Sequence, residues 1–251
     1  MERSLPDTHT GGETLHARVL AQIRADILSC RWMPNERLTL EVLRLQYKAG
    51  FSPLREALMR LGAEGLVQLT QNKGFRVAGV SGDSLFDLMQ SRIDIESIAL
   101  RRSIGSGGVE WEADVLAAFH RLSKQKKLTG AQGDSISSEW SKAHRAFHRS
   151  LVAACNSPIM LSIREGLFEK AERYVALAIL SKLAPRNDLA EHEQIMRAAL
   201  ARNVSRVVEL NREHIERTFK KVAKSLKKRL ALSAPAVGDT SGRAELLPLA
   251  G

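Results

Sequence analysis

Residues 50–77 read GFSPLREALMRLGAEGLVQLTQNKGFRV, and this stretch decides the fold of the N-terminal part of the chain. Ser52 is the predicted N-cap of a helix, with Pro53 in the first helical position. Apolar side chains then follow at helical spacing, namely Leu54, Ala57, Leu58 and Leu61. Gly65 is expected to end this helix, because glycine commonly follows the last helical turn.

A β-hairpin is predicted directly after that helix, from residues 67–70 and 75–80 joined by a short turn. Two earlier segments, residues 16–28 and 39–47, carry apolar residues at helical spacing. The second of them is joined to the residue 52 helix by a Gly-containing turn. Two short helices, a tight turn and a hairpin are typical of a winged helix-turn-helix, which we place at residues 15–80.

The exposed face of the helix that starts at Ser52 is a candidate DNA-reading surface, because the second helix of a helix-turn-helix enters the major groove. Arg55 falls in its first turn, where the helix N-terminus favours phosphate and the side chain can also pair with guanine. The alternative is an ordinary solvated surface. The residues predicted to contact DNA are Ser52, Pro53, Arg55, Arg60, Lys73 and Gly74.

The rest of the chain, residues 83–230, has helical periodicity almost throughout. Six helices are predicted, near residues 83–103, 110–127, 137–155, 158–182, 188–202 and 204–230. We expect one all-helical bundle there. Residues 1–14 and 231–251 are polar or rich in small residues and are predicted to be flexible tails. The predicted fold class is therefore mainly α, a winged helix-turn-helix followed by a helical bundle.

Composition excludes several classes of protein. The 251 residues carry 38 Lys and Arg against 28 Asp and Glu, and the net charge of +10 suggests an anionic partner without identifying it. No segment approaches the roughly 20 apolar residues of a membrane span, so we expect no membrane association. Residues 1–14 lack the apolar core of a secretory signal, which predicts a cytoplasmic protein. Cys30 and Cys155 are expected to be free thiols, with a single bridge as the alternative.

Four of the seven histidines form a pattern that favours a metal site. His144 and His148 are four residues apart on a predicted helix, so their imidazoles share one face. His192 opens a later helix and His214 lies on the last one, and a bundle can bring such residues together. Imidazole favours transition metals over Mg or Ca, and we expect a divalent ion, Zn or alternatively Ni. The alternative for each histidine is a hydrogen-bonded position in the core or on the surface.

Several segments resemble the winged helix of GntR-family bacterial transcription regulators. They are Ser52-Pro53-Leu54-Arg55-Glu56-Ala57-Leu58, Glu64-Gly65-Leu66-Val67 and Lys73-Gly74-Phe75-Arg76-Val77. The resemblance implies binding to a double-stranded DNA operator and a place on the bacterial nucleoid. The family commonly has Arg where this chain has Phe51 and Glu41, so the operators of better-known members are not carried over.

The helical part is similar to the ligand-binding FCD domain of the FadR subfamily within those regulators. The matching residues are Arg92 with Glu96, Phe147-His148, Asn156, Glu191-His192 and His214. Many members hold a divalent metal, and His148, His192 and His214 match its three histidines. His144 stands where the family has Asp, which leaves a four-histidine or a three-histidine site open. Residues 107–116 further resemble repressors of 4-aminobutyrate and glutarate catabolism within the subfamily, which implies control of small-acid catabolism.

The substitution of Asp by His144 has an electrostatic consequence. Four neutral imidazoles leave a divalent ion its full charge of +2, whereas an Asp would leave +1. We therefore expect a small carboxylate effector, a hydroxy acid or a dicarboxylate. Arg92 is its predicted second contact, with an ordinary helix-surface salt bridge to Glu96 as the alternative.

These patterns favour a homodimeric transcription regulator that is controlled by an effector. The dimer would present two winged helices to a near-palindromic DNA site. We expect the regulator to repress transcription and the effector to relieve this repression. One alternative is a metal-dependent enzyme in the bundle, although no recognised motif places a general base beside the histidines. Another is an interaction module that has lost DNA binding, suggested by Phe51 and Glu41.

A basic run closes the periodic part of the chain, with seven Lys and Arg and no acidic residue among residues 217–229. Apolar residues recur there every three or four positions, so an amphipathic helix with a solvated basic face is predicted. A membrane-surface helix and an auxiliary contact to DNA phosphate are the alternatives.

Overall fold

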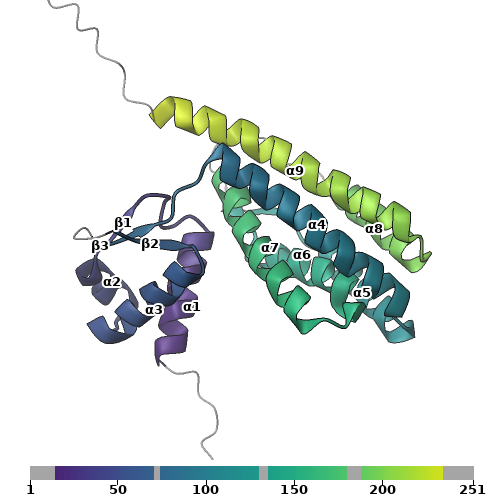
Figure 1. Ribbon diagram of the computed structural model, residues 1–251, viewed down its shortest axis with the longest axis horizontal. Helices are drawn as coiled ribbons and strands as arrows, with labels where there is room; N and C mark the ends of the chain where they lie inside the picture. Colours follow the sequence, from purple (N-terminus) through teal and green to yellow (C-terminus); the bar gives the residue numbers. More distant parts are fainter. Residues whose placement is uncertain (1–14, 71–73, 130–134, 180–187, 234–251) are drawn as a thin grey trace, which may run out of the picture.

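The computed structural model describes residues 15–70, 74–129, 135–179 and 188–233 (Figure 1). An N-terminal unit of three helices and a small sheet lies beside a larger helical unit. The elements of the N-terminal unit are α1 (Leu15–Leu28), β1 (Arg37–Leu38), α2 (Leu40–Tyr47), α3 (Phe51–Ala63), β2 (Val67–Thr70) and β3 (Gly74–Val77). The predicted mainly α fold with a winged helix-turn-helix is confirmed.

The N-terminal unit is held together by the apolar faces that the sequence pattern predicted. Leu54, Leu58 and Leu61 of α3 are fully buried against α1 and the sheet. The sheet is antiparallel in the order β1-β3-β2, and Val67 pairs with Val77 across the predicted hairpin. The two-residue strand β1 was missed, because two residues carry no periodicity. Gly65 has a positive φ of 76° directly beyond α3, as its predicted role requires.

The start of α3 differs from the prediction. The helix begins at Phe51 with Gly50 as its N-cap, so the prediction that Ser52 caps it is wrong. Lys48 takes the left-handed conformation, φ 49°, which reverses the chain within two residues after α2 and lets the next helix start early. Ser52 lies inside the first turn, where its hydroxyl donates to Glu56 at 3.3 Å. Pro53 is tolerated there because the first-turn amides have no intrahelical acceptor.

The second unit is a helical bundle in which α4 packs against α6, α7 and α9. Its elements are α4 (Gly82–Ser106), α5 (Val109–Ser123), β4 (Leu128–Thr129), β5 (Ser135–Ile136), α6 (Ser138–Val152), the 3₁₀ helix η1 (Ala153–Cys155), α7 (Pro158–Ile179), α8 (Leu189–Leu200) and α9 (Val204–Ser233). All six predicted helices are present with small shifts at their ends.

The bundle is not purely helical, which corrects the expectation of an all-helical domain. Leu128 pairs with Ile136 and Thr129 with Ser135 in a short antiparallel ladder. The predicted helix of residues 110–127 stops at Ser123, so Lys127 is free of it and bonds Asp188 at 2.6 Å. Cys30 and Cys155 are buried thiols that no disulfide joins, as expected.

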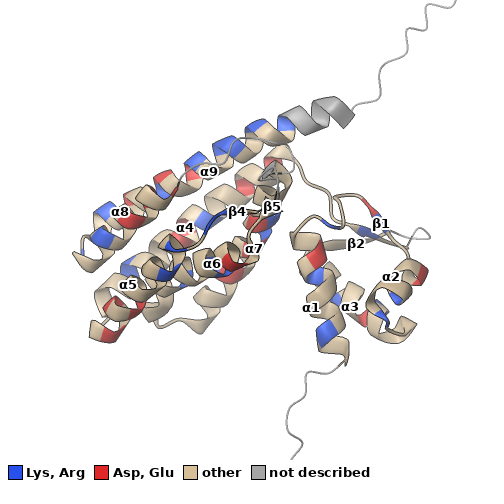
Figure 2. Ribbon diagram, turned by 180° about the vertical axis from the view of Figure 1, so that it is seen from behind, with Lys and Arg blue, Asp and Glu red and all other residues tan. Residues whose placement is uncertain are grey.

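Helix α9 is amphipathic, as the basic run predicted. Phe219, Val222 and Leu226 are buried, whereas Lys220, Lys224 and Lys227 are exposed. Figure 2 shows Lys and Arg along the outer side of this helix. None of the described helices combines the length and apolar character needed to cross a membrane.

The two units are in direct contact through α7. The guanidinium of Arg173 donates to the carbonyl of Ala78, and the Cys30 thiol lies 3.5 Å from the carbonyl of Arg173. Arg24 of α1 donates to Glu169 at 3.3 Å. Helix α7, which packs against α4 and α9 in the bundle, thus also touches α1 of the winged helix.

Candidate functional site

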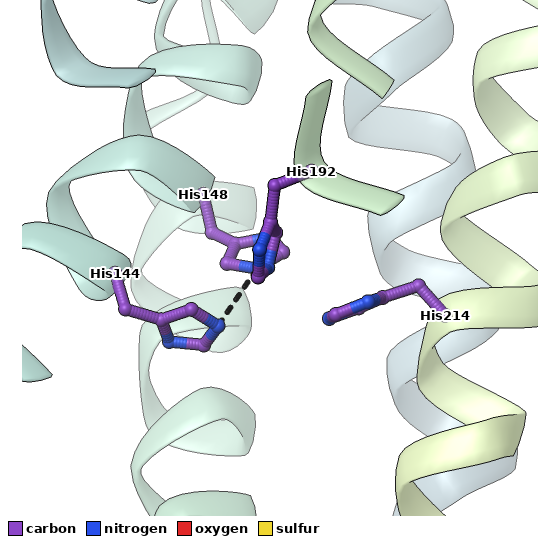
Figure 3. A group of neighbouring side chains, drawn as sticks. All are labelled: His144, His148, His192 and His214. Carbon is purple, nitrogen blue, oxygen red and sulfur yellow. Dashed lines mark hydrogen bonds between the residues drawn. The ribbon is translucent and has the colours of Figure 1, made fainter. Parts of the chain in front are cut away.

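Helices α6, α8 and α9 bring the four predicted histidines together inside the bundle (Figure 3). One ligand nitrogen from each of His144, His148, His192 and His214 lies within 4.8 Å of the other three. The Nε2 atom of His148 is 3.2 Å from Nε2 of both His144 and His192. His16 and His120 do not belong to this cluster, and His9 lies outside the described residues.

Local structure explains how each imidazole reaches the centre. The spacing of four on α6 places His144 and His148 on one face. His192 lies in the first turn of α8, after the N-cap residue Asp188, which Lys127 holds in an ion pair. Trp140 stacks on His144 with ring centroids 4.5 Å apart. These contacts position the ring of His144 and the start of the helix that carries His192.

The cluster favours neutral imidazoles. His148, His192 and His214 are buried, and His144 is partly exposed. Burial, followed by the neighbouring imidazoles, lowers the pKa of both His144 and His148 well below the ordinary value. A neutral imidazole keeps a lone pair, so the histidines remain available as metal ligands near neutral pH.

The donor set fits a divalent transition metal. Zn–N bonds of about 2.0–2.1 Å place the ligands of a tetrahedral ion roughly 3.3 Å apart, and two of the separations are 3.2 Å. The Nδ1 atom of His214 is 3.0 Å from a carboxylate oxygen of Glu191. Such a carboxylate orients the ring and presents Nε2 to a metal. Glu191 therefore has a ligand-orienting position rather than that of a general base.

Arg92 forms the salt bridge with Glu96 that was considered as an alternative, but both side chains are buried and do not lie on the helix surface. Its Nε and Nη2 atoms donate to Oε1 of Glu96 at 3.0 and 2.7 Å. Asn211 donates to the other oxygen at 3.2 Å. Burial would raise the pKa of Glu96, but Arg92 and Arg164 overcome this and hold it below the usual range. The donors of Arg92 nearest Glu96 are thus already engaged.

Sequence reasoning missed two residues of α7 that lie beside the histidines, Arg164 and Phe168. The Phe168 ring is 5.8 Å from that of His144 and 5.7 Å from that of His148. The Arg164 guanidinium carbon lies 4.4 Å from the Phe168 centroid. The available signal was a charged residue at position 164 within the buried stripe of α7, which continues at Phe168 and Ala171.

The predicted DNA-contacting residues lie at the outside of the N-terminal unit. Ser52, Arg55 and Arg60 are exposed on α3, and Pro53 is partly exposed. Gly74 opens β3 with a positive φ of 77°, and Lys73 lies outside the described residues. Sequence reasoning missed Arg44 of α2, whose guanidinium carbon is 5.8 Å from the centroid of the exposed Phe51 ring. Arg44 thus places a positive charge at the N-terminal end of α3.

Comparison with known proteins gives matches over both units. Residues 15–77 match the model of bacterial regulatory proteins of the gntR family, and residues 87–217 match the FCD domain. The chain is 38% identical to the HTH-type transcriptional repressor GlaR of Escherichia coli (strain K12), over 77% of this chain and 89% of that protein. It is 37% identical to the uncharacterized HTH-type transcriptional regulator BphR of Paraburkholderia xenovorans (strain LB400), over 78% and 80%. The fold is similar to the solved structure of E. coli McbR/YncC, with a TM-score of 0.68, 18% identity and coverage of 85% and 99%.

Proposed function

The chain belongs to the GntR family of bacterial regulatory proteins, with an FCD domain, and we propose that it represses transcription until a small carboxylate binds a metal in its helical bundle. Membership makes it a DNA-binding transcription regulator and not an enzyme. The observation that carries the proposal is the convergence of four histidines in a bundle that also contacts the winged helix. The repressor sign is supported by the name of its relative GlaR.

The metal is a divalent transition ion, Zn or alternatively Ni, held by His144, His148, His192 and His214. When bound it would supply a positive charge, and by expanding to a fifth ligand it could accept an oxygen of the effector. The chain contributes four neutral imidazoles and no carboxylate to the ligand set, so the charge of +2 is left for the effector to balance. This favours a hydroxy acid or a dicarboxylate over a neutral ligand.

The DNA face consists of Arg44 together with the residues predicted from the sequence, Ser52, Pro53, Arg55, Arg60, Lys73 and Gly74. Arg55 is placed to read a base or a phosphate from the first turns of α3. A homodimer would present two such faces to the two halves of an operator.

The DNA-binding domain is residues 15–80 and the effector domain residues 83–230, between tails at 1–14 and 231–251. The protein would act on the bacterial nucleoid, in the cytoplasm.

Helix α7 is the proposed connection between effector and DNA. Phe168 touches the histidine cluster, and the neighbouring Glu169 accepts from Arg24 of the DNA-binding domain. A ligand that repositions α7 would therefore change how the winged helices are held. Because the linkage between two binding equilibria is reciprocal, bound DNA would lower the affinity for the effector by the same factor.

Fluorescence anisotropy on the DNA upstream of the protein's own gene tests the proposal. Metal-loaded protein should bind this DNA at low salt and release it when a linear dicarboxylate is added. His148→Ala should bind DNA but no longer respond to the carboxylate. DNA release by neutral sugars with no response to carboxylates would contradict the proposal, as would the absence of DNA binding.

A further inference from the structure

The side chain of Arg164 is buried beside the histidine cluster, and two of its three nitrogen atoms make no hydrogen bond to the described residues. It is 1% exposed, and its Nη1 atom donates to Glu165 at 3.1 Å. Its Nε and Nη2 atoms are buried and have no hydrogen-bond partner among the described residues. A buried guanidinium in this state is costly, because its desolvation is only partly compensated.

The buried carboxylate beside Arg164, that of Glu96, does not satisfy these two donors. Oε1 of Glu96 lies 3.9 Å from Nε of Arg164, which is beyond hydrogen-bond distance. That oxygen already accepts two bonds from Arg92, and the other accepts from Asn211. Two buried guanidiniums, Arg92 and Arg164, therefore share the single buried carboxylate of Glu96. The other carboxylate on Arg164, that of Glu165, is partly exposed and bonds only Nη1.

The two unused donors belong to one edge of the guanidinium plane. Nε and Nη2 point in parallel and match the two oxygens of one carboxylate, a geometry that Arg provides and Lys does not. The Phe168 ring contacts both this guanidinium and the imidazoles of His144 and His148. Arg164 and the candidate metal ligands thus share Phe168 as a neighbour.

We propose that Arg164 binds a second carboxylate of the effector through Nε and Nη2, which makes the natural effector a dicarboxylate. The proposal rests on the proposed function, in which the first carboxylate binds at the metal. It assigns the role predicted for Arg92 to a different residue. Arg92 keeps Glu96 in place, and Phe168 forms the apolar wall beside the carbon chain that connects the two carboxylates.

Isothermal titration calorimetry on the Zn-loaded full chain tests this assignment. The probes are succinate, glutarate and adipate, each compared with the monocarboxylate of equal carbon number: butyrate, pentanoate or hexanoate. At least one dicarboxylate should bind roughly 10- to 100-fold tighter than its partner, as expected for a charge-assisted pair of hydrogen bonds. Equal affinity within all three pairs would overturn the proposal while leaving the metal-bound carboxylate of the proposed function intact. Failure of every acid to bind would instead contradict the proposed function itself.

Substitution of Arg164 provides the residue-level test. Arg164→Met should remove the dicarboxylate preference and leave monocarboxylate and Zn affinities unchanged. Little thermal stability should be lost, because two buried nitrogens without a hydrogen-bond partner are removed with the guanidinium. Arg164→Lys keeps the charge but loses the paired donors, so it should also lose most of the preference; it serves if the Met variant does not fold. Arg145→Met is the matched control, since Arg145 also lies near Phe168 but donates to Glu165, Glu169 and Glu172. Retention of the preference in either folded Arg164 variant, or its loss in the control, would overturn the assignment.

Discussion

Arg24 of the DNA-binding domain donates to Glu169 of α7, with 3.3 Å between Nη1 and Oε2. The other oxygen of Glu169 accepts from Arg145 at 3.0 Å, and Arg145 follows His144 in the sequence. The same Arg24 side chain also bonds Glu64, directly beyond α3. A short series of ion pairs therefore connects the histidine cluster with the end of the DNA-reading helix.

Glu169→Gln should weaken the coupling between effector and DNA. The substitution keeps the size of the side chain but removes the charge that Arg24 and Arg145 share. We expect the carboxylate-induced loss of DNA affinity to shrink by about 2- to 30-fold, corresponding to roughly 0.5–2 kcal/mol of coupling. Anisotropy titrations with and without a dicarboxylate measure the ratio. Glu172→Gln is the control, because Glu172 bonds Arg145 and has no described contact with Arg24; an equal loss in both variants would exclude a specific role for Glu169.

Arg55→Ala should weaken operator binding by about 1–3 kcal/mol, which is the usual value of a lost base contact. The exposed Arg101 of α4 is the matched control, since Arg101→Ala removes the same charge from the bundle. Gel-shift titrations at fixed salt give the two affinities. Equal affinities for the two variants would mean that α3 does not read the DNA.

Arg44→Ala should reduce the affinity for all DNA sequences by a similar factor and lower the salt dependence of binding by about one counterion. The reason is that Arg44 stands beside the exposed Phe51, where it is placed to contact a phosphate. Titrations at several salt concentrations measure the slope. A change in sequence preference with an unchanged slope would argue for a base contact instead.

The metal-free protein should lose stability on acidification. The pKa values of His144 and His148 are lowered in the folded state, so the unfolded chain binds more protons below about pH 6.5. Stability should be flat above that pH and then fall with each group by up to about 1.4 kcal/mol per pH unit, until the folded-state pKa is passed. Urea unfolding at pH 8, 7, 6 and 5 tests the sign. A His148→Ala variant should show a shallower slope, and an identical slope would remove this histidine as the cause.

Glu96→Gln should destabilise the bundle by roughly 3–5 kcal/mol, since it leaves Arg92 and Arg164 without their buried carboxylate. The control has the same spacing at the surface: Glu193 pairs with Arg197, four residues away, and both are exposed. Glu193→Gln should cost about 0.5 kcal/mol or less. Chemical denaturation compares the two, and similar losses would show that burial does not set the value of this pair.

The sequence by itself determined the elements that depend on local periodicity and on neighbours along the chain. The stripe from Leu54 to Leu61 and the glycine at position 65 were sufficient for α3 and its end, and the spacing of four was sufficient to pair His144 with His148. The start of α3 escaped prediction because the left-handed turn at Lys48 carries no compositional signal. The strand β1 escaped it because two residues have no period.

Tertiary structure decided which distant groups meet and which donors remain unused. From the sequence, Arg92 was a predicted effector contact with a surface salt bridge as the alternative, and Arg164 had no predicted role. Packing of α4 against α7 buries both around Glu96. In this packing Arg92 donates hydrogen bonds to Glu96, whereas Nε and Nη2 of Arg164 have no partner among the described residues. Hydrogen-bond satisfaction depends on distances between helices that are far apart in the sequence, so no pattern along the chain could assign it.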